Sequence, residues 1–593
     1  MKTSLRTPRT TYYALRTSSR GVTLLDTVVG TALMLVVFLG IAAVFKLSVD
    51  VVTNNKARAG AIALANERME YIRSLAYASV GTVGGIPSGL MAQSETVALN
   101  SVSYTRRTVV EYVDDPGDGM GASDTNNITV DYKVAKVDVA WTSRIGTRHI
   151  TLVTRISPPN GMEIACPPTA LCGTLTIYVL NVATQPVLNA QVRIVNTTTS
   201  PGIDITTYAN TDGVVSIVGA PSATGYQVTV TKTGYSTDRT YNATSENTNP
   251  TPGPFTVSDN QTTSATFRID LFSNMTVNTY SLSTNTWEDS FGDDSKIGPS
   301  TNIEITGNRA RFAGSQPWTA PADLRSQTIT PVALSRWGMF SWNDTRPSET
   351  TITYHVYYPD GSASALVPDS ILPGNSAGFT SGTSVDLSAI PAAAYPSLIL
   401  EAYMVALNPN APSPSVEDWS LTYQSWQGIA ILFTMTGAKT IGSGPGGTIY
   451  KYNQSLVTNS SGVLAISALE WGSYTITVSS GTGYDIASSC NPQPETLDPG
   501  ATTNTSLYLA PHTTNSLLVD VKSAGILIQT ASVRLFKTGY DTTLTTDQCG
   551  QAFFGNIPAE TYTVTVSADG YTPVTQNDVS ISGTSRLSVV MSQ

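Results

Sequence analysis

The hydrophobic pattern predicts one long helix at the start of the chain. Residues 28–45 are apolar on every side, carry no charge and are just long enough to cross a bilayer as a helix. Beyond them, small and apolar residues recur every three or four positions, which predicts a helix with one apolar face. These positions are Ala57, Ala61, Leu64, Ala65, Met69, Ile72 and Leu75. We expect a single helix over residues 24–77, about 80 Å long, whose second half packs against another layer.

A different pattern begins after the helix. Apolar and polar residues alternate in four runs, as they do in half-buried antiparallel strands. The runs are residues 95–99, 103–113, 128–142 and 148–156. We expect a sheet over residues 79–160 that covers the apolar face of the helix.

Charge sets the orientation of the apolar run. The first 21 residues contain basic side chains and no acid, although the whole chain carries a net charge of −10. The basic residues are Lys2, Arg6, Arg9, Arg16 and Arg20. They hold the N-terminal side in the cytoplasm, so everything after Lys46 faces outward. The acidic balance of the rest argues against a nucleic-acid partner.

Three hypotheses fit this N-terminal segment: a secretory signal peptide, an uncleaved anchor and a cleaved leader. No small-x-small cleavage site follows Phe45, which disfavours the signal peptide. Residues 19–26, Ser-Arg-Gly-Val-Thr-Leu-Leu-Asp, resemble the signature of the type IV prepilin and pseudopilin family. In that family a basic leader ends in Gly and an acid stands at the fifth position after the cut. Here Val22 replaces the usual Phe or Met, and Asp26 replaces the usual Glu.

The resemblance implies specific roles for three residues. A prepilin peptidase would cut between Gly21 and Val22, and the new terminus at Val22 would be methylated. Asp26 would pair with the terminal amine of a neighbouring subunit, since a carboxylate in an apolar stretch is costly when it is unpaired. The alternative is that Asp26 only marks the membrane interface.

An acidic turn in the expected sheet has two interpretations. Asp114, Asp115 and Asp118 lie between the second and third runs. Pseudopilins can hold Ca²⁺ in such a loop, so the resemblance makes calcium a hypothesis here. A solvated turn without metal is the alternative, and no other cofactor is expected.

An internal repeat follows a Pro-rich linker at residues 161–172. Residues 226–235, 474–484 and 562–571 each run from a Tyr through an alternating strand to a Gly-Tyr turn. The repeat resembles the carboxypeptidase regulatory-like module, a small Greek-key sandwich similar to transthyretin. Its copies are expected at 173–270, 426–511 and 512–593. The resemblance implies an accessory module and no peptidase activity.

The four cysteines are expected to form two disulfides in an outward-facing chain. Cys490 and Cys549 lie near strand ends of the second and third copies, which we expect to be neighbours. Cys166 and Cys172 are close enough in sequence to pair with each other. Free buried thiols at Cys490 and Cys549 are the alternative.

Residues 271–425 differ in composition and contain five of the eight tryptophans. We expect a larger sandwich there, of lectin-like or jelly-roll type. If exposed, Trp287, Trp337 and Trp342 could stack on sugar rings of a surface glycan. Burial in the core is the alternative, because sandwiches bury large aromatic side chains.

Enzyme motifs are matched only superficially. Residues 374–378 fit the nucleophile-elbow pattern around Ser376, but no helix is predicted after it and no His follows within the same domain. Residues 442–447 fit GxGxxG but open onto an expected strand, where a dinucleotide site needs a helix. Only Asp293, Asp294, Glu417 and Asp418 stay open as paired carboxylates for glycoside hydrolysis. We expect no enzyme.

Together these patterns predict a mainly β chain: a leader over residues 1–21, a pilin-type helix over 22–78, a pilin-like antiparallel sheet and four β-sandwich modules in a row. The expected function is that of a minor or tip-proximal type IV pilin-like subunit that displays its modules for adhesion. Its partners would be other pilin subunits, the membrane and a surface glycan or protein. It would lie in the cytoplasmic membrane first and on the cell surface after assembly. The alternatives are a secretion pseudopilin and a membrane-anchored glycan-binding protein or glycosidase that never polymerises.

Overall fold

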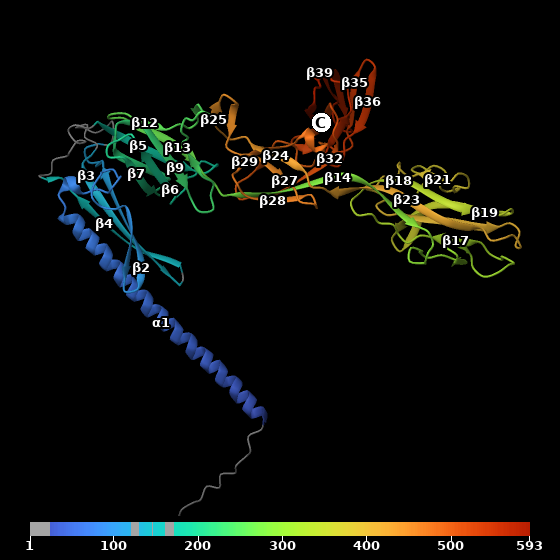
Figure 1. The fold of residues 1–593 in the computed structure, drawn as a ribbon, viewed down its shortest axis with the longest axis horizontal. Coiled ribbons are helices and arrows are strands. Elements are labelled where there is room, and N and C mark those ends of the chain that lie inside the picture. Colours follow the sequence, from blue (N-terminus) through green and yellow to red (C-terminus); the bar gives the residue numbers. More distant parts are fainter. Residues whose placement is uncertain (1–23, 120–129, 145, 160–170) are drawn as a thin grey trace, which may run out of the picture. The chain divides into compact units, whose positions relative to one another are not determined.

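The computed structural model describes residues 24–119, 130–144, 146–159 and 171–593, which form two compact units. The first unit contains the N-terminal helix, a four-stranded sheet and a first sandwich. The second contains most of the chain from Arg268 onward, with the short segments 181–184 and 231–253. The fold is mainly β with one long helix at its start, as the sequence predicts (Figure 1).

The helix α1 spans Leu24–Ser74 and is followed by a 3₁₀ turn, η1, at Tyr77–Ser79. The apolar positions predicted for its second half all pack against the sheet, and all except Leu75 are fully buried. The prediction of a two-part helix is therefore confirmed: one half is covered by protein and the other is not.

A four-stranded antiparallel sheet covers the second half of α1 in the order β1-β2-β3-β4. Its strands are β1 Ser94–Leu99, β2 Val102–Val113, β3 Tyr132–Ser143 and β4 Gly146–Ile156. Alternation sets the buried face: Ala135, Val137, Val139 and Trp141 of β3 all join the core beneath the helix. The predicted sheet is present, and its third strand begins at Tyr132 within the described residues.

A first sandwich, called module 1, follows in the same unit. Its strands are β5 Cys172–Leu180, β6 Gln191–Asn196, β7 Ile203–Tyr208, β8 Val214–Pro221, β9 Ala223–Thr231, β12 Phe255–Val257 and β13 Thr262–Arg268. One layer has the order β13-β5-β8, and the other has β9-β6-β7 with β12 beside β9. The first and last strands of the module are thus neighbours.

Module 3, at the C-terminal end, repeats this scheme. Its strands are β33 Ser516–Ser523, β34 Ile526–Leu527, β35 Ser532–Lys537, β36 Tyr540–Thr545, β37 Gln551–Gly555, β38 Thr561–Ser567, β39 Val574–Ser580 and β40 Thr584–Val590. The first strand, β33, pairs antiparallel with β37 and parallel with the last strand, β40. The other layer has the order β36-β35-β38-β39.

Module 2 has the same pairing but begins far earlier in the chain than the repeat suggests. Its first strand is the start of β14, Ser273–Asp289, which pairs antiparallel with β28 and parallel with β32. Met275 and Val277 of β14 lie in the same core as Phe433 and Ile476. The remaining strands are β24 Leu432–Gly437, β27 Asn453–Val457, β28 Val463–Leu469, β29 Gly472–Val478, β30 Tyr484–Ser489, β31 Glu495–Leu497 and β32 Thr502–Pro511.

The expected boundary between a domain at 271–425 and a copy at 426–511 is therefore wrong. The larger sandwich is inserted into module 2, directly after that module's first strand. β14 continues outward, and β23, Ser415–Gly428, returns beside it in antiparallel register from Tyr280↔Gly428 to Asp289↔Trp419. The repeat is interrupted in sequence but not in space, because the two ends of the insertion meet as paired strands.

The insert (residues 282–427) is a sandwich with its own aromatic core. One layer contains the outer parts of β14 and β23 with β15 Ile303–Ile305, β16 Ala310–Phe312, β18 Leu334–Thr345 and β21 Ser384–Asp386. The other has the order β17-β22-β19-β20, with β17 Ala322–Arg325, β19 Thr350–Asp360, β20 Ala363–Leu366 and β22 Ile399–Ala406. Figure 1 shows it at the far end of β14 and β23.

Smaller elements complete the second unit. They are β10 Asp238–Arg239, β11 Asn249–Pro250, β25 Thr440–Gly444, β26 Gly447–Tyr450 and the 3₁₀ turn η4 Ser480–Thr482. β11, β25 and β26 form a three-stranded antiparallel sheet.

Candidate assembly surface and candidate ligand sites

The first half of α1 is an apolar surface that nothing in the described protein covers. By length and composition α1 can cross a membrane, and none of the most apolar part of the helix is buried. Large side chains such as Leu33, Phe38 and Phe45 are exposed. Burial of one such side chain stabilises by about 1.5–3 kcal/mol, so a row of them requires a bilayer or other helices around it.

The predicted processing and assembly residues stand at the start of this surface. Asp26 lies in the first turn of α1, two residues after its first residue, Leu24. Gly21 and Val22 lie outside the described residues.

Tyr104 of β2 fixes the helix to the sheet at close range. Its hydroxyl donates to the carbonyl oxygen of Ala57 at 2.9 Å, and the ring is fully buried. A Cβ at position 60 would lie 2.5 Å from the Tyr104 hydroxyl, so Gly60 allows this approach. The contact holds α1 at the point where its covered half begins.

A buried ionic cluster continues the attachment. Arg106 of β2 donates to the Leu64 carbonyl at 3.2 Å and to the Glu95 carboxylate at 3.0 Å. Arg68 of α1 reaches the same carboxylate. Both guanidinium groups share Glu95, and Arg106 also lies 3.5 Å from the Glu67 carboxylate, so removing Glu95 would take a shared counter-charge from two buried cations.

Lys133 of β3 fixes the far end of the helix. Its ammonium donates to the carbonyl oxygens of Tyr77 at 2.8 Å and Val80 at 2.7 Å, directly after α1. Burial lowers the pKa of Lys133 to about 8. Burial also raises the pKa of the Tyr77 hydroxyl to about 12. The turn after the helix is therefore held by a desolvated cation.

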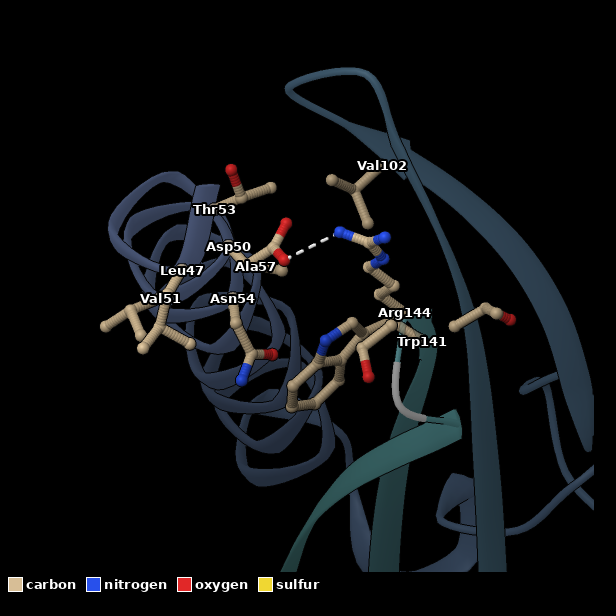
Figure 2. A pocket seen from close by; sticks show the side chains of 11 residues that line it. Leu47, Asp50, Val51, Thr53, Asn54, Ala57, Val102, Trp141 and Arg144 are labelled. Carbon is tan, nitrogen blue, oxygen red and sulfur yellow. Dashed lines mark hydrogen bonds and ion pairs between the residues drawn. The ribbon is translucent and has the colours of Figure 1, made fainter. Parts of the chain in front are cut away.

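A groove of about 450 Å³ opens where α1 leaves the sheet (Figure 2). Its walls come from Leu47–Ala57 of α1, Val102 of β2 and the end of β3 with Arg144. Arg144 and Asp50 form an exposed ion pair across it, with Nη1 and Oδ2 3.0 Å apart. Inside, the buried indole N–H of Trp141 and the amide oxygen of Asn54 have no hydrogen-bond partner within the described protein.

The acidic turn has a basic neighbour in the sheet. Arg155 lies 3.6 Å from the carboxylate of Asp115, which gives that acid a cationic neighbour already. Among the described residues, no group of three or more His, Cys, Asp or Glu side chains is arranged to hold a metal ion. Calcium at Asp114, Asp115 and Asp118 stays a prediction.

The tryptophans of the insert mostly form its core. Trp337 and Trp342 are 1% and 4% exposed, so the hypothesis that these two stack on sugars is wrong. Trp342 stacks on Tyr354 with ring centroids 4.0 Å apart, and the Trp337 indole donates to the Tyr395 carbonyl at 2.9 Å. Trp287 is half-buried against the same core. Burying a large apolar ring in the sandwich interior is more favourable in free energy than leaving it in solvent, so the rings lie in the core.

The superficial enzyme motifs occupy structural turns. Ser376 lies in a turn, where its hydroxyl bonds to the Asp369 carboxylate at 2.5 Å, and no helix follows it. The glycines at 442–447 form the tight connection between β25 and β26. Glu417 accepts from Thr345 at 2.9 Å, and Asp418, its neighbour on β23, accepts from Asn343 at 3.3 Å. Asp293 and Asp294 lie in a turn after β14.

Modules 2 and 3 are joined by the disulfide that the sequence predicts. Cys490 and Cys549 are bonded, with their Cα atoms 4.4 Å apart. Beside them, the buried Asp485 accepts from the backbone N–H of Thr513 at 3.0 Å and pairs with His512 at 2.8 Å. Cys172 is also disulfide-bonded, and its predicted partner Cys166 lies outside the described residues.

The tyrosine that opens each repeat has the same structural task in all three modules. Tyr226 donates to the Pro221 carbonyl at 2.6 Å, and Tyr562 donates to the Pro558 carbonyl at 2.9 Å. In module 2, Tyr474 donates to the Glu470 carbonyl at 2.6 Å. Each bond ties a core strand to the residues just before it, which end the preceding strand in module 1 and lie in the connection in modules 2 and 3. The recurring sequence pattern thus reports a recurring hydrogen bond.

Comparison with known families supports one of the three modules by sequence. Residues 518–592 match the family described as carboxypeptidase regulatory-like domain. The match covers module 3 only. No curated protein is similar enough in sequence to the chain to count as a relative.

Several solved structures are similar to the chain over long stretches. The TIE protein of Bacillus anthracis is 10% identical, with 84% of this chain and 73% of that one covered and a TM-score of 0.16. BcpA, the major pilin subunit of Bacillus cereus, is 11% identical over 71% of this chain and 99% of its own, with a TM-score of 0.13. The major pilin SpaD of Corynebacterium diphtheriae is 10% identical over 71% and 97%, with a TM-score of 0.12. At such TM-scores these similarities carry no argument about function.

Proposed function

We propose that this chain is a pilin-type subunit of an extracellular type IV filament or pseudopilus, in a minor or tip-proximal position. It is held in the cytoplasmic membrane by α1 before assembly and displays its β modules for adhesion or surface contact afterwards. The observation that carries the proposal is the division of α1. One half is covered by a four-stranded sheet, and the other half is apolar and uncovered.

This division suits a subunit that changes its surroundings. A bilayer can cover the free half before assembly, and the free halves of neighbouring subunits can cover it in a filament. The motif at residues 19–26 supports the second state, because a new terminal amine at Val22 would give the Asp26 carboxylate a partner. An anchor that never assembles has no use for such a motif.

The size of the outward part supports a minor or tip-proximal position. Three modules and an insert follow the sheet, and this bulk on every subunit would crowd a closely packed filament. The insert is carried on two paired strands, β14 and β23, so any ligand bound there is held by a double connection. Display of this region is the task we assign to the outward modules.

Processing is the first test. Mass spectrometry of the mature N-terminal peptide should find a methylated Val22. An intact Met1, or a cut after residue 40, would overturn the type IV assignment and leave an anchored surface protein.

Assembly is the second test. Asp26→Ala should leave insertion and cleavage intact and reduce recovery of the chain in sheared filaments about tenfold. Glu70→Ala is the matched control, since Glu70 is an exposed acid of α1 that pairs with Arg73 at 2.7 Å and with no other cation in the described part of the chain. Equal recovery of both variants would show that Asp26 does not set subunit register. Retention of the wild-type chain in the membrane under filament-forming conditions would favour a protein that does not polymerise.

A further inference from the structure

The groove beside Asp50 lies at the depth where a membrane ends. The apolar run stops at Phe45, and the groove begins at Leu47. With a rise of 1.5 Å per residue, Asp50 stands about 7–8 Å beyond Phe45 along the helix. The headgroup layer extends about 5–8 Å outward from the hydrocarbon core. If α1 spans the membrane as proposed, the end of the groove at Leu47 and Asp50 opens into the headgroup layer of the outer leaflet, and Asn54 stands about 13–14 Å beyond Phe45, on the outer side of that layer.

The apolar side of the groove is incomplete without a further component. Leu47 and Val51, which line the groove, are 64% and 51% exposed, although the sheet begins to cover the helix at Ala57. They extend the apolar surface of the membrane span past Lys46 and up to the groove. An acyl chain lying along Leu47 and Val51 would cover this side.

The polar side of the groove contains two groups that the protein leaves unsatisfied. Trp141 is only 5% exposed, yet its indole N–H has no acceptor within the described protein. The buried amide oxygen of Asn54 has no donor. An unsatisfied buried polar group costs about 1–3 kcal/mol. A ligand that supplies an acceptor for one group and a donor for the other removes this cost, which makes its binding free energy more favourable. Figure 2 shows the two side chains beside each other, below the ion pair of Arg144 and Asp50.

We propose that this groove binds one zwitterionic phospholipid of the outer leaflet. The lipid phosphate accepts from the Arg144 guanidinium and from the Trp141 N–H. The lipid ammonium donates to the Asp50 carboxylate and to the Asn54 amide oxygen. One acyl chain follows Leu47 and Val51 toward the hydrocarbon core.

Charge and hydrogen bonding favour a lipid over the helix of a second copy. Arg144 and Asp50 present one positive and one negative group side by side, which matches a phosphate next to an ammonium. An apolar helix satisfies its own backbone groups and offers no acceptor for the Trp141 N–H. Tryptophan also favours the membrane–water interface, where its ring is apolar and its N–H reaches polar groups.

The test uses tryptophan fluorescence of the full chain in vesicles of phosphatidylglycerol that contain phosphatidylethanolamine with brominated acyl chains. Bromine quenches nearby indoles, so part of the emission of the eight tryptophans should be lost. Trp141→Phe removes the indole that reports on the groove and should abolish this quenching, whereas Arg144→Gln and Asp50→Asn keep the indole and change only the polar groups offered to the lipid. Trp471→Phe is the matched control, because the buried Trp471 indole also has no hydrogen-bond partner within the described protein but does not line the groove. Quenching that persists in Trp141→Phe would overturn the proposal.

Headgroup preference is tested with exposed residues, whose substitution leaves the fold intact. Arg144→Gln should weaken the quenching by brominated phosphatidylethanolamine about tenfold. Asp50→Asn should remove the preference for phosphatidylethanolamine over phosphatidylglycerol, whereas Glu70→Gln should retain it. Absence of quenching together with cross-linking of position 54 to α1 of a second copy would replace the lipid by a subunit contact. Because these measurements need only the membrane-anchored chain, failure of filament assembly would leave their outcome unaffected.

Discussion

Modules 2 and 3 share one fold but differ in how the chain builds it. In both, the first strand pairs antiparallel with one partner and parallel with the last strand of the module. In module 3 the chain goes from the first strand β33 to β35 through a short connection. In module 2 it leaves through β14, builds the whole insert and returns through β23 before β24 begins.

The difference shows that a Greek-key module can accept a whole inserted domain after its first strand and keep its fold. The insertion begins and ends on paired strands, so the chain ends that module 2 must bring together are already adjacent. Loop-closure entropy grows only slowly with loop length, and here the insert's own fold holds the ends in place.

Two deletions give the largest expected effect. Replacing residues 285–423 by Asn-Gly would join Thr284 to Gln424, which face each other across β14 and β23. Module 2 should then fold as an uninterrupted module of about unchanged stability. Deleting residues 271–425 instead removes Met275 and Val277 from the core of module 2 and should unfold it, because losing two buried apolar side chains and a central strand exceeds its stability.

Limited proteolysis of the two variants, read by mass spectrometry, separates these outcomes. Protection of β24 and β29 should persist in the first variant and be lost in the second. Equal protection in both would show that β14 is not a strand of module 2, and the comparison with module 3 would fail.

The local sequence pattern was sufficient to predict contacts between parts of the chain that are close in sequence. The periodic positions from Ala57 to Leu75 predicted the covered face of α1, because a helix buries residues at a fixed spacing. The pairing of Cys490 with Cys549 followed from two neighbouring modules. β14 could not be assigned to its domain in this way. Met275 and Val277 alternate with polar residues, a pattern that fits a strand of module 2 as well as a strand of the larger sandwich. Only the partners of β14, which are distant in sequence, show that it belongs to module 2.

The candidate sites depend still more on tertiary structure. The sequence left exposed sugar-binding rings and buried core rings as two hypotheses for Trp337 and Trp342, and the structure buries both. The groove between α1 and β3 was not predicted. Asn54 and Trp141 are distant in sequence, and an unsatisfied N–H becomes visible only when all its neighbours are known. The only early signal was a tryptophan in a strand that faces the end of a membrane span.

Removing the disulfide should have the next largest effect, at the joint between the two modules. Replacing Cys490 and Cys549 by Ala should loosen the joint between the modules by about 2–5 kcal/mol. Hydrogen exchange of β30 and β37, which flank the bond, should rise, while exchange in the insert strand β19 stays unchanged. Faster exchange throughout the insert would mean that module 2 and the insert unfold as one, contrary to their separate cores.

The repeated tyrosines provide a smaller and matched pair of changes. Tyr474→Phe in module 2 and Tyr562→Phe in module 3 each remove one hydrogen bond to a carbonyl of the preceding connection. Each should destabilise its own module by about 1–2 kcal/mol, measured by denaturant unfolding or local hydrogen exchange. Tyr571→Phe is the control, because within the described protein the Tyr571 hydroxyl makes no hydrogen bond. A clearly larger loss in module 2 would show that the insertion weakens its host.

The smallest expected difference is in the response of the two modules to acid. In module 2, burial raises the pKa of Glu495 above its ordinary value, although Thr505 and Asn491 donate to the carboxylate. A raised pKa means that the folded state holds the proton more tightly than the unfolded state. Its stabilising contribution is therefore complete below the ordinary glutamate value of about 4.3 and is lost as pH rises through the folded pKa.

In module 3, the Arg534 hydrogen bond lowers the pKa of Asp541. The contribution of Asp541 to stability is present above about 3.9 and is lost as pH falls through its folded pKa. Acidification from neutral pH should thus favour module 2 through Glu495, by at most about 1.4 kcal/mol per pH unit, and disfavour module 3 through the exposed Asp541. Hydrogen exchange of β29 and β38, corrected for intrinsic rates, should show these opposite trends, with Glu495→Gln flattening the first and Asp541→Asn the second. Trends of the same sign in both modules, unchanged by the two substitutions, would show that neither carboxyl group controls the acid response of its module.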